Sequence, residues 1–161
     1  YTFSMKVTDL EQGISVRLQR TNAQFRKVHI KGGDDIGKGT FLFLLDVTAL
    51  SRDVYIPISV ASGKKPTGFI YQIEGTKAGT IATTEITCEG KDISQITLGT
   101  IIYCKVPATK IGTFRIIVEM QGKLGGDYTV VLNRIHYKYD PSDARYLKLE
   151  ENFRSESVSF S

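Results

Sequence analysis

The sequence predicts an all-β fold, an antiparallel β-sandwich. β-branched residues are abundant, with 17 Ile, 16 Thr and 11 Val among 161 residues, whereas Ala occurs only 7 times. Such side chains favour strands over helices because a helix restricts their χ1 angles. Several segments alternate apolar and polar residues with a period of two, and turn-forming Gly, Asp and Pro residues separate them. This spacing is typical of half-buried strands in a sandwich.

Length and composition predict one domain over residues 1–161. Hydrophobic residues make up 41% of the chain and charged residues 24%, which is ordinary for a globular protein and excludes disordered, collagen-like and coiled-coil chains. The longest apolar run has five residues, 41–45, whereas a transmembrane helix needs about 20. We therefore expect no membrane span, and the ends of the sequence predict no particular compartment.

The first half of the chain contains three alternating segments. Ile14, Val16 and Leu18 share one face of the first segment, and charged and apolar residues alternate over 25–31. A third segment, 54–60, contains Pro57. Proline has no N–H to donate to a ladder, so we expect this strand to lie at a sheet edge or to carry a bulge.

The second half continues the same pattern. Residues 114–121 and 128–133 alternate apart from the apolar Ile117 and Val131, whereas residues 100–106 are largely apolar on both faces. A strand with two apolar faces is expected to be central or to be covered on its outer side. Taken together, the segments fit a jelly-roll-like or immunoglobulin-like sandwich, and the sequence does not specify the strand order.

The C-terminal part predicts one short helix. Asp140, Pro141, Ser142 and Asp143 offer a helix start, and apolar residues follow at Tyr146, Leu149 and Phe153, with helical spacing. A strand over residues 146–149 is the alternative. Residues 155–161 are rich in Ser and are expected to form an edge strand or a mobile tail.

The two cysteines, Cys88 and Cys104, are too few for a disulfide scaffold and do not form a Cys-x-x-Cys pair. In a chain long enough to build its own core, we expect buried free thiols. One disulfide between them is the alternative.

One segment resembles the phosphate-binding loop of nucleoside monophosphate kinases. Residues 32–40, from Gly32 to Thr40, follow the pattern G-x-x-x-x-G-K-G-T. The resemblance implies a nucleotide phosphotransferase in which Lys38 reaches the terminal phosphate and Thr40 serves magnesium. However, Asp34 and Asp35 place negative charge where phosphates would lie, and the chain that follows is rich in strands. These features favour a Gly/Asp hairpin loop.

Residues for catalysis are scarce. Only His29 and His136 could act as an imidazole base, and no G-x-S-x-G motif is present. His, Cys and carboxylate residues do not cluster with the spacing of metal ligands. The sequence therefore predicts a protein that is not an enzyme and that has no metal or cofactor.

Basic residues form the candidate binding site, which comprises Arg20, Arg26, Lys27, Lys64 and Lys65. A cationic strand face with a stacking ring is how sheets bind single-stranded nucleic acid. In a regular strand, however, such residues alternate between two faces, which would split the cluster unless a bulge intervenes.

Two further features concern the first basic segment and the C-terminal tyrosines. Arg17 lies on the polar face of its strand, and Phe25 and His29 are the rings interleaved with the cations. Tyr137, Tyr139 and Tyr146 could form an aromatic platform for a sugar or a protein partner, or could belong to the core and its rim.

The function predicted from these observations is that of a non-catalytic structural, assembly or protein-interaction module, such as a jelly-roll subunit of a shell, capsid-like particle or larger complex. Apolar positions expected to face outward are Ile101, Tyr103, Ile117 and Val131. Such positions require burial, which a protein partner in a homo- or hetero-oligomer would supply. Binding of nucleic acid or another anion by the basic strand face is the alternative. The phosphotransferase implied by Gly32–Thr40 is a third possibility.

Overall fold

The computed structural model describes residues 13–60 and 68–161, which form eleven strands. The strands are β1 (Ile14–Val28), β2 (Ile36–Ala49), β3 (Val54–Val60), β4 (Phe69–Gly75), β5 (Gly79–Glu89), β6 (Ser94–Leu98), β7 (Ile101–Val106), β8 (Ile111–Lys123), β9 (Asp127–Tyr137), β10 (Arg145–Lys148) and β11 (Val158–Ser159). The all-β prediction is thus confirmed. No helix that is long and apolar enough to cross a membrane occurs in the described residues.

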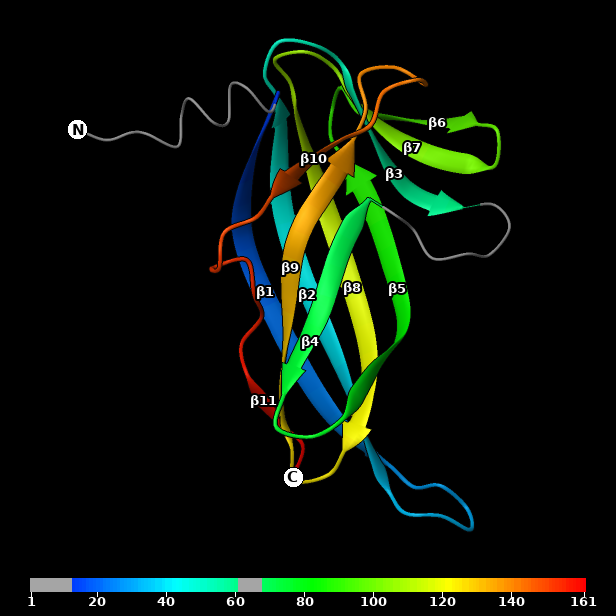
Figure 1. Cartoon of the computed structure of the whole chain (residues 1–161), viewed down its shortest axis with the longest axis vertical. Coiled ribbons are helices and arrows are strands. Elements are labelled where there is room, and N and C mark those ends of the chain that lie inside the picture. Colours follow the sequence, from blue (N-terminus) through cyan, green and yellow to red (C-terminus); the bar gives the residue numbers. More distant parts are fainter. Residues whose placement is uncertain (1–12, 61–67) are drawn as a thin grey trace, which may run out of the picture.

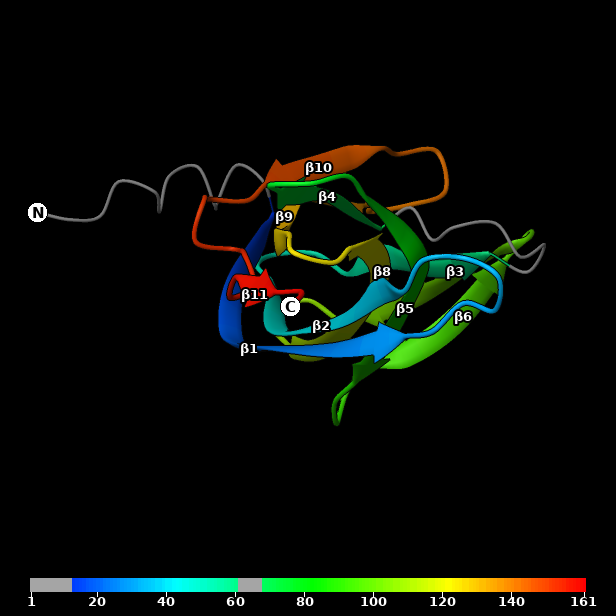
Figure 2. The ribbon, with the colours of Figure 1, turned by 90° about the horizontal axis from the view of Figure 1, so that it is seen from below.

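The strands form three antiparallel sheets that pack together (Figures 1 and 2). Sheet A has the order β1-β2-β8-β5, and sheet B has the order β3-β7-β6. In sheet C, β4 pairs with one edge of β9, while β10 and β11 pair with β9 at its two ends. Figure 2 shows sheets A and C as the two layers of a sandwich, with β6 of sheet B at one side. A bridge between Tyr55 and Lys138 connects sheets B and C.

The core lies between sheets A and C because alternate residues of their long strands point inward. In β2, every second residue from Gly37 to Ala49 is buried, and the residues between them are only partly buried. The rings and aliphatic side chains from β2, β8 and β9 that fill the core include Phe41, Phe43, Leu45, Phe114, Ile116, Val118, Tyr128, Val130 and Leu132. Each side chain of this size stabilises the fold by roughly 1.5–3 kcal/mol when fully buried.

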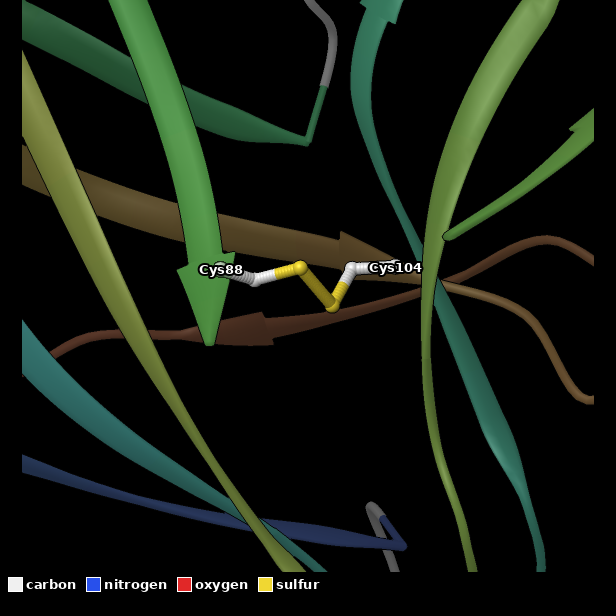
Figure 3. Close-up of a disulfide and its surroundings, with 2 residues drawn as sticks. All are labelled: Cys88 and Cys104. Atoms are coloured by element: carbon white, nitrogen blue, oxygen red, sulfur yellow. A yellow bond between two sulfur atoms is a disulfide. The ribbon is translucent and has the colours of Figure 1, made fainter. Parts of the chain in front are cut away.

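A disulfide between Cys88 and Cys104 joins sheet A to sheet B, so the expectation of free thiols is wrong (Figure 3). Cys88 lies near the end of β5, and Cys104 lies in β7. The two residues are 16 positions apart in sequence, and their Cα atoms are 6.5 Å apart. The pairing depends on how two sheets meet, which the spacing of the residues along the chain does not reveal.

The predicted C-terminal helix is also wrong. Residues Arg145–Lys148 form β10, and the strand alternative applies. Leu147 and Leu149 are buried, whereas Tyr146 is half exposed and Lys148 is exposed. This alternation with a period of two fits the edge of a sheet, and here it prevails over the helical spacing from Tyr146 to Phe153.

Pro57 and the β7 strand lie where their sequences predict. β3 is an edge strand of sheet B, and its register with β7 shifts between Pro57 and Ser59. The proline therefore combines an edge position with a bulge, two devices that hinder further strand pairing. β7 is the central strand of sheet B, which explains why both of its faces are largely apolar.

The last residues close one side of the sandwich. β11 pairs with the start of β9 and also contacts β1, and Phe160 is completely buried. The Phe160 ring lies against the rings of Phe25 and Tyr128, at centroid distances of 4.9 and 4.4 Å. The C-terminal segment is therefore part of the core.

Candidate interaction surface

Sheet B and the connection between β9 and β10 enclose a largely apolar hollow, which we name the sheet B hollow. Its volume is about 550 Å³. Its lining residues are Tyr55, Ile96, Leu98, Gly99, Tyr103, Lys138, Tyr139, Asp140 and Pro141. Tyr55 from β3, Tyr103 from β7 and Ile96 from β6 belong to the same face of sheet B, because they alternate with the residues that face the core.

Two further hollows continue from the first one across the outer face of sheet C. The middle hollow, of about 470 Å³, shares the wall residue Lys138 with the sheet B hollow and also contains His136 and Arg145. The sheet C hollow, of about 500 Å³, shares the wall residues Ile70 and Tyr146 with the middle hollow. We name the three adjacent hollows together the interaction surface.

Exposed apolar side chains concentrate on this surface. Five large hydrophobic residues are exposed in the described part of the chain: Ile30, Ile70, Leu98, Ile111 and Tyr146. Of these, Leu98 lines the sheet B hollow, and Ile70 and Tyr146 separate the other two hollows. Exposed apolar residues beside hollows are typical of binding surfaces, which makes the three hollows the candidate site.

The wall between sheets B and C is held rigidly around Tyr139. The guanidinium groups of Arg52 and Arg145 lie 4.2 and 4.3 Å from the centre of the Tyr139 ring. Asp143 accepts hydrogen bonds from the Tyr139 backbone N–H, at 3.0 Å, and from Arg145 Nε, at 2.7 Å. The backbone hydrogen bond, and then the Arg145 side chain, hold the pKa of Asp143 below its usual value. These contacts fix the position of the Tyr139 ring in the wall of the sheet B hollow.

Asp140 and Ser142 fold the adjacent turn. Asp140 Oδ1 accepts hydrogen bonds from the Ser142 backbone N–H, at 3.0 Å, and from the Ser142 hydroxyl, at 2.7 Å. The same hydrogen bonds lower the pKa of Asp140. The residues that predicted a helix start therefore form a local Asx turn. This turn places Pro141 in the lining of the sheet B hollow.

The sheet C hollow is more polar than its neighbours. Arg154 Nη1 donates a hydrogen bond to Glu74 Oε1 at 3.0 Å, and Asn133 donates to Gln72 at 3.3 Å. These exposed pairs contribute little stability, because water competes for the same groups. They place hydrogen-bonding groups from β4, β9 and the C-terminal segment along the sheet C hollow.

Tyr146 stands between an arginine and a histidine. Arg134 lies over its ring at 4.7 Å from the centroid, and the His136 ring lies at 5.9 Å. Burial, and then the charge of Arg134, lower the pKa of His136, so its imidazole is neutral at pH 7. The cations beside Tyr146 are therefore arginines and lysines.

The three tyrosines that could form an aromatic platform lie at different depths. Tyr137 is buried, borders the middle hollow and meets the Tyr139 ring edge-on, with ring centroids 5.9 Å apart. Tyr139 lines the sheet B hollow, and Tyr146 is 50% exposed beside the middle hollow.

A β-bulge brings part of the predicted basic cluster together on sheet A. The register between β1 and β2 shifts between Leu18 and Arg20. As a result, Arg17 pairs with Asp46, Arg20 with Leu44, and Arg26 with Lys38. The β2 partners of these arginines alternate with the buried residues of β2 and therefore lie on the outer face of sheet A. Paired residues share a face, so all three arginines lie on that outer face too. Arg115 of β8 pairs with Leu44 from the other side and adds a further cation.

The other predicted basic residues do not join this face. Lys27 pairs with Gly37, which belongs to the inner face of sheet A. Lys64 and Lys65 lie outside the described residues. The ring of Phe25 packs against Phe160 in the core, so it is not available for stacking on a base. The basic face therefore lacks the interleaved ring that the nucleic-acid hypothesis includes.

The segment that resembles a phosphate-binding loop forms a hairpin. It begins in the turn between β1 and β2 and continues into β2, where Lys38 and Thr40 lie on the outer face of sheet A. A phosphate-binding loop leads into a helix whose N-terminus faces the phosphates, whereas here a 14-residue strand follows. The geometry that the resemblance implies is therefore absent from this segment.

The histidines do not form a catalytic arrangement with other residues in the described part of the chain. His29 Nδ1 lies 2.6 Å from Asp35 Oδ1 in the exposed β1–β2 turn, and His136 contacts Tyr146. Within residues 13–60 and 68–161, no three His, Cys, Asp or Glu residues are placed to hold a metal ion.

Two of the apolar positions predicted to need a partner are already covered by the chain itself. Tyr103 and Val131 are each only 5% exposed, so the expectation that a partner buries them is wrong. At Val131, the C-terminal segment supplies the cover, because Arg154 forms a bridge with this residue. Ile101 and Ile117 remain partly buried.

Tyr103, Tyr139 and Tyr146, which line the hollows, were among the candidates named from the sequence, whereas Ile70 and Leu98 were missed. Ile70 and Leu98 follow the ordinary alternation of their strands, and nothing in the sequence marks them as exposed. The one available signal was strand β6, whose apolar residues Ile96 and Leu98 are flanked by uncharged polar residues.

Comparisons with models of protein families, with curated proteins and with solved structures find no match for this chain.

Proposed function

We propose that the protein is a non-catalytic assembly module that binds further protein subunits through the interaction surface. The observation that carries this proposal is the position of the exposed apolar residues. Three of the five in the described residues, Ile70, Leu98 and Tyr146, line the three adjacent hollows. Burying such side chains against a second subunit contributes about 25 cal/mol for each Å² of apolar surface removed from water, from which the entropy lost on association is subtracted.

Sheet B gives further support for a protein partner. β6 lies at the edge of this sheet, next to the hollow, and pairs with β7 alone among the described strands. An exposed strand edge presents N–H and C=O groups with the spacing of another β-strand. A polypeptide can use this edge and the apolar hollow at the same time, whereas a small apolar ligand uses only the hollow.

Analytical ultracentrifugation over a wide range of protein concentrations tests the proposal. We expect the unmodified protein to associate with increasing concentration, and we expect Leu98→Asp together with Ile70→Asp to prevent this. The matched control is Ile30→Asp together with Ile111→Asp, since these residues are also exposed (41% and 56%) but lie outside the hollows. A monomer at all concentrations, or an equal effect of both pairs, would contradict the proposal.

A second candidate function is binding of an anionic polymer to the outer face of sheet A. The β1 bulge supports it, because it places Arg17, Arg20 and Arg26 on one face beside Lys38. Opposite like charges, such as Arg26 and Lys38, are unfavourable unless an anion lies between them. This candidate predicts an affinity for single-stranded DNA that falls with salt and that Arg20→Ala with Arg26→Ala weakens. Lys27→Ala is the control, because Lys27 does not belong to the outer face of sheet A on which the arginines lie.

A further inference from the structure

Among the described strands, β6 is the one edge that has none of the usual protection. Of the other outer strands, β1, β3 and β5 each contain a bulge, because the pairing register skips one of their residues. β4 carries Glu74 and contacts β5, β10 has two charged residues among four, and β11 has only two residues. β6, Ser-Gln-Ile-Thr-Leu, has no charge and no proline, and its register with β7 is regular. Proteins blunt their exposed edges, so an edge of this kind is typical of a strand that is paired in an assembly.

The turn between β6 and β7 determines which backbone groups of β6 face the open edge. Leu98 pairs with Ile101, and the two residues between them form the turn. Such a turn is closed by a hydrogen bond from the N–H of its fourth residue to the C=O of its first, so the backbone groups of Leu98 point toward β7. Backbone groups alternate in direction along an antiparallel strand. The N–H and C=O groups of Gln95 and Thr97 therefore point away from β7.

We propose that β6 pairs in an antiparallel manner with β6 of a second copy, with the two Ile96 residues opposite each other. In this register, Gln95 of each copy lies opposite Thr97 of the other, so the backbone groups at the open edge exchange hydrogen bonds. Because the same edge serves both copies, a two-fold axis between the Ile96 residues closes the dimer. The proposal rests on the proposed function and names the partner that meets sheet B.

The apolar side chains of β6 fit this pairing. Ile96 and Leu98 line the sheet B hollow, and Ile96 pairs with Tyr103 of β7 within the same copy. Residues opposite each other in an antiparallel pair share one face of the sheet. The second copy therefore adds its own Ile96 and Leu98 to the same apolar layer. The two copies of sheet B become one continuous sheet with both hollows on one face.

The charges near β6 favour an antiparallel copy. The charged residues closest to β6 along the chain are Lys91 and Asp92, which precede it, whereas the turn that follows it is uncharged. In the antiparallel dimer, this charged end of each copy meets the uncharged turn of the other. A parallel pairing would place Lys91 beside Lys91 and Asp92 beside Asp92, and such contacts are unfavourable.

The position of β6 leaves room for a second copy. Figure 1 shows β6 and β7 projecting sideways from the long strands of sheets A and C. Gln95, Thr97 and Leu98 are exposed, and among the described strands β6 pairs with β7 alone. Two copies can therefore meet at this edge while their sandwiches lie on opposite sides of the axis.

Cross-linking of a single introduced cysteine to its own copy tests the register. The two native cysteines form the Cys88–Cys104 disulfide, so an introduced cysteine supplies the free thiol. At Ile96 the two Cα atoms would lie about 4.5 Å apart, which suits a disulfide. We expect Ile96→Cys to give a disulfide-linked dimer under mild oxidation. The matched control is Ser94→Cys on the same strand, whose two copies would lie about 13 Å apart. Equal yields, or no link at Ile96, would overturn the proposal.

A charge exchange tests the pairing without changing the hollow, because the side chains of Gln95 and Thr97 lie on the other face of β6. Gln95→Lys with Thr97→Lys places lysines opposite each other and should weaken association in sedimentation by about tenfold or more. Gln95→Glu with Thr97→Glu should do the same. An equal mixture of the two variants should associate again, since each lysine then meets a glutamate. A mixture that associates no better than its components would overturn the proposal. If association depends on Leu98 and Ile70 but not on these substitutions, the inference fails while the proposed function stands.

Discussion

The ring of Phe160 lies where a side chain on Gly37 would have to be. A Cβ at Gly37 would come within 2.9 Å of Phe160 Cγ, and one at Gly39 would come equally close to Phe160 Cζ. Both glycines belong to the segment that resembles a phosphate-binding loop. In this fold, their lack of a side chain makes room for an aromatic ring from the C-terminus.

Gly37→Ala should therefore destabilise the protein. Because the rings of Phe160 and Phe25 both surround the new methyl group, we expect the free energy of unfolding to fall by about 2 kcal/mol, as in other overpacked cores. Urea denaturation measures this change. Gly33→Ala, in the preceding turn, is the control, since the nearest atom to its Cβ is 3.5 Å away. An equal loss in both variants would contradict the packing role of Gly37.

Removal of the disulfide should destabilise the fold and free β6. Cys88 and Cys104 close a loop that contains the whole of β6. A loop of this length corresponds to about 3 kcal/mol of unfolding free energy. We therefore expect Cys88→Ala with Cys104→Ala to lower the urea midpoint and to speed hydrogen exchange in β6. A reductant should have the same effect on the unmodified protein and none on the variant. If the reductant leaves the midpoint unchanged, the disulfide contributes no stability.

Tyr71→Phe should stabilise the protein, although Tyr71 packs against the core. The Tyr71 hydroxyl is buried and forms no hydrogen bond of good geometry among the described residues. Burial raises its pKa, and the neighbouring Thr84 side chain offsets this only in part. Removing an unpaired buried hydroxyl should raise the free energy of unfolding by about 1 kcal/mol. Tyr128→Phe is the control and should be destabilising, because the Tyr128 hydroxyl donates to the Lys123 carbonyl at 3.0 Å. Thermal unfolding of both variants checks the opposite signs.

Asp46 should make stability depend on pH in the acid range. Burial alone would raise its pKa, but hydrogen bonds from Arg17, Gln19 and Thr113, with the charge of Arg17, hold the pKa below its usual value of 3.8. A carboxyl group with a lowered pKa stabilises the fold above pH 3.8, and this contribution is lost as the pH falls through the lowered value.

Asp46→Asn should therefore lower the free energy of unfolding at pH 7 by about 1 kcal/mol and flatten its decline below pH 4. Urea denaturation between pH 2 and 7 provides the measurement. Asp34→Asn, which removes the same charge from an exposed turn, should leave the curve almost unchanged. If both variants give the same curve, Asp46 is not the source of the pH dependence.

The alternation of side chains predicts the strands because burial of one face imposes a period of two. It fails near Tyr146, where helical and strand spacings coexist over a few residues and the outcome depends on β9, far away in the sequence. Asp140 illustrates the same limit: its carboxylate holds an Asx turn, and a turn of this kind uses the same residues as a helix start.

The candidate binding residues were harder to predict than the strands. The face of sheet A on which Arg20 lies depends on a single extra residue at the bulge. This residue interrupts the alternation, so odd-numbered residues before it and even-numbered residues after it share one face. The disulfide and the sheet B hollow depend on how β7 meets β5 and on how the β9–β10 connection lies against sheet B. The hollow therefore joins Leu98 to Tyr139, two residues that no local pattern relates.

Hydrogen exchange in β6 at low and high protein concentration tests the proposed interface most directly. If a second subunit covers this edge, exchange of the backbone amides of Ser94–Leu98 should slow as the protein associates, whereas exchange in the exposed β1–β2 turn should not change. Association that protects the outer face of sheet A and leaves β6 unaffected would contradict an interface at sheets B and C.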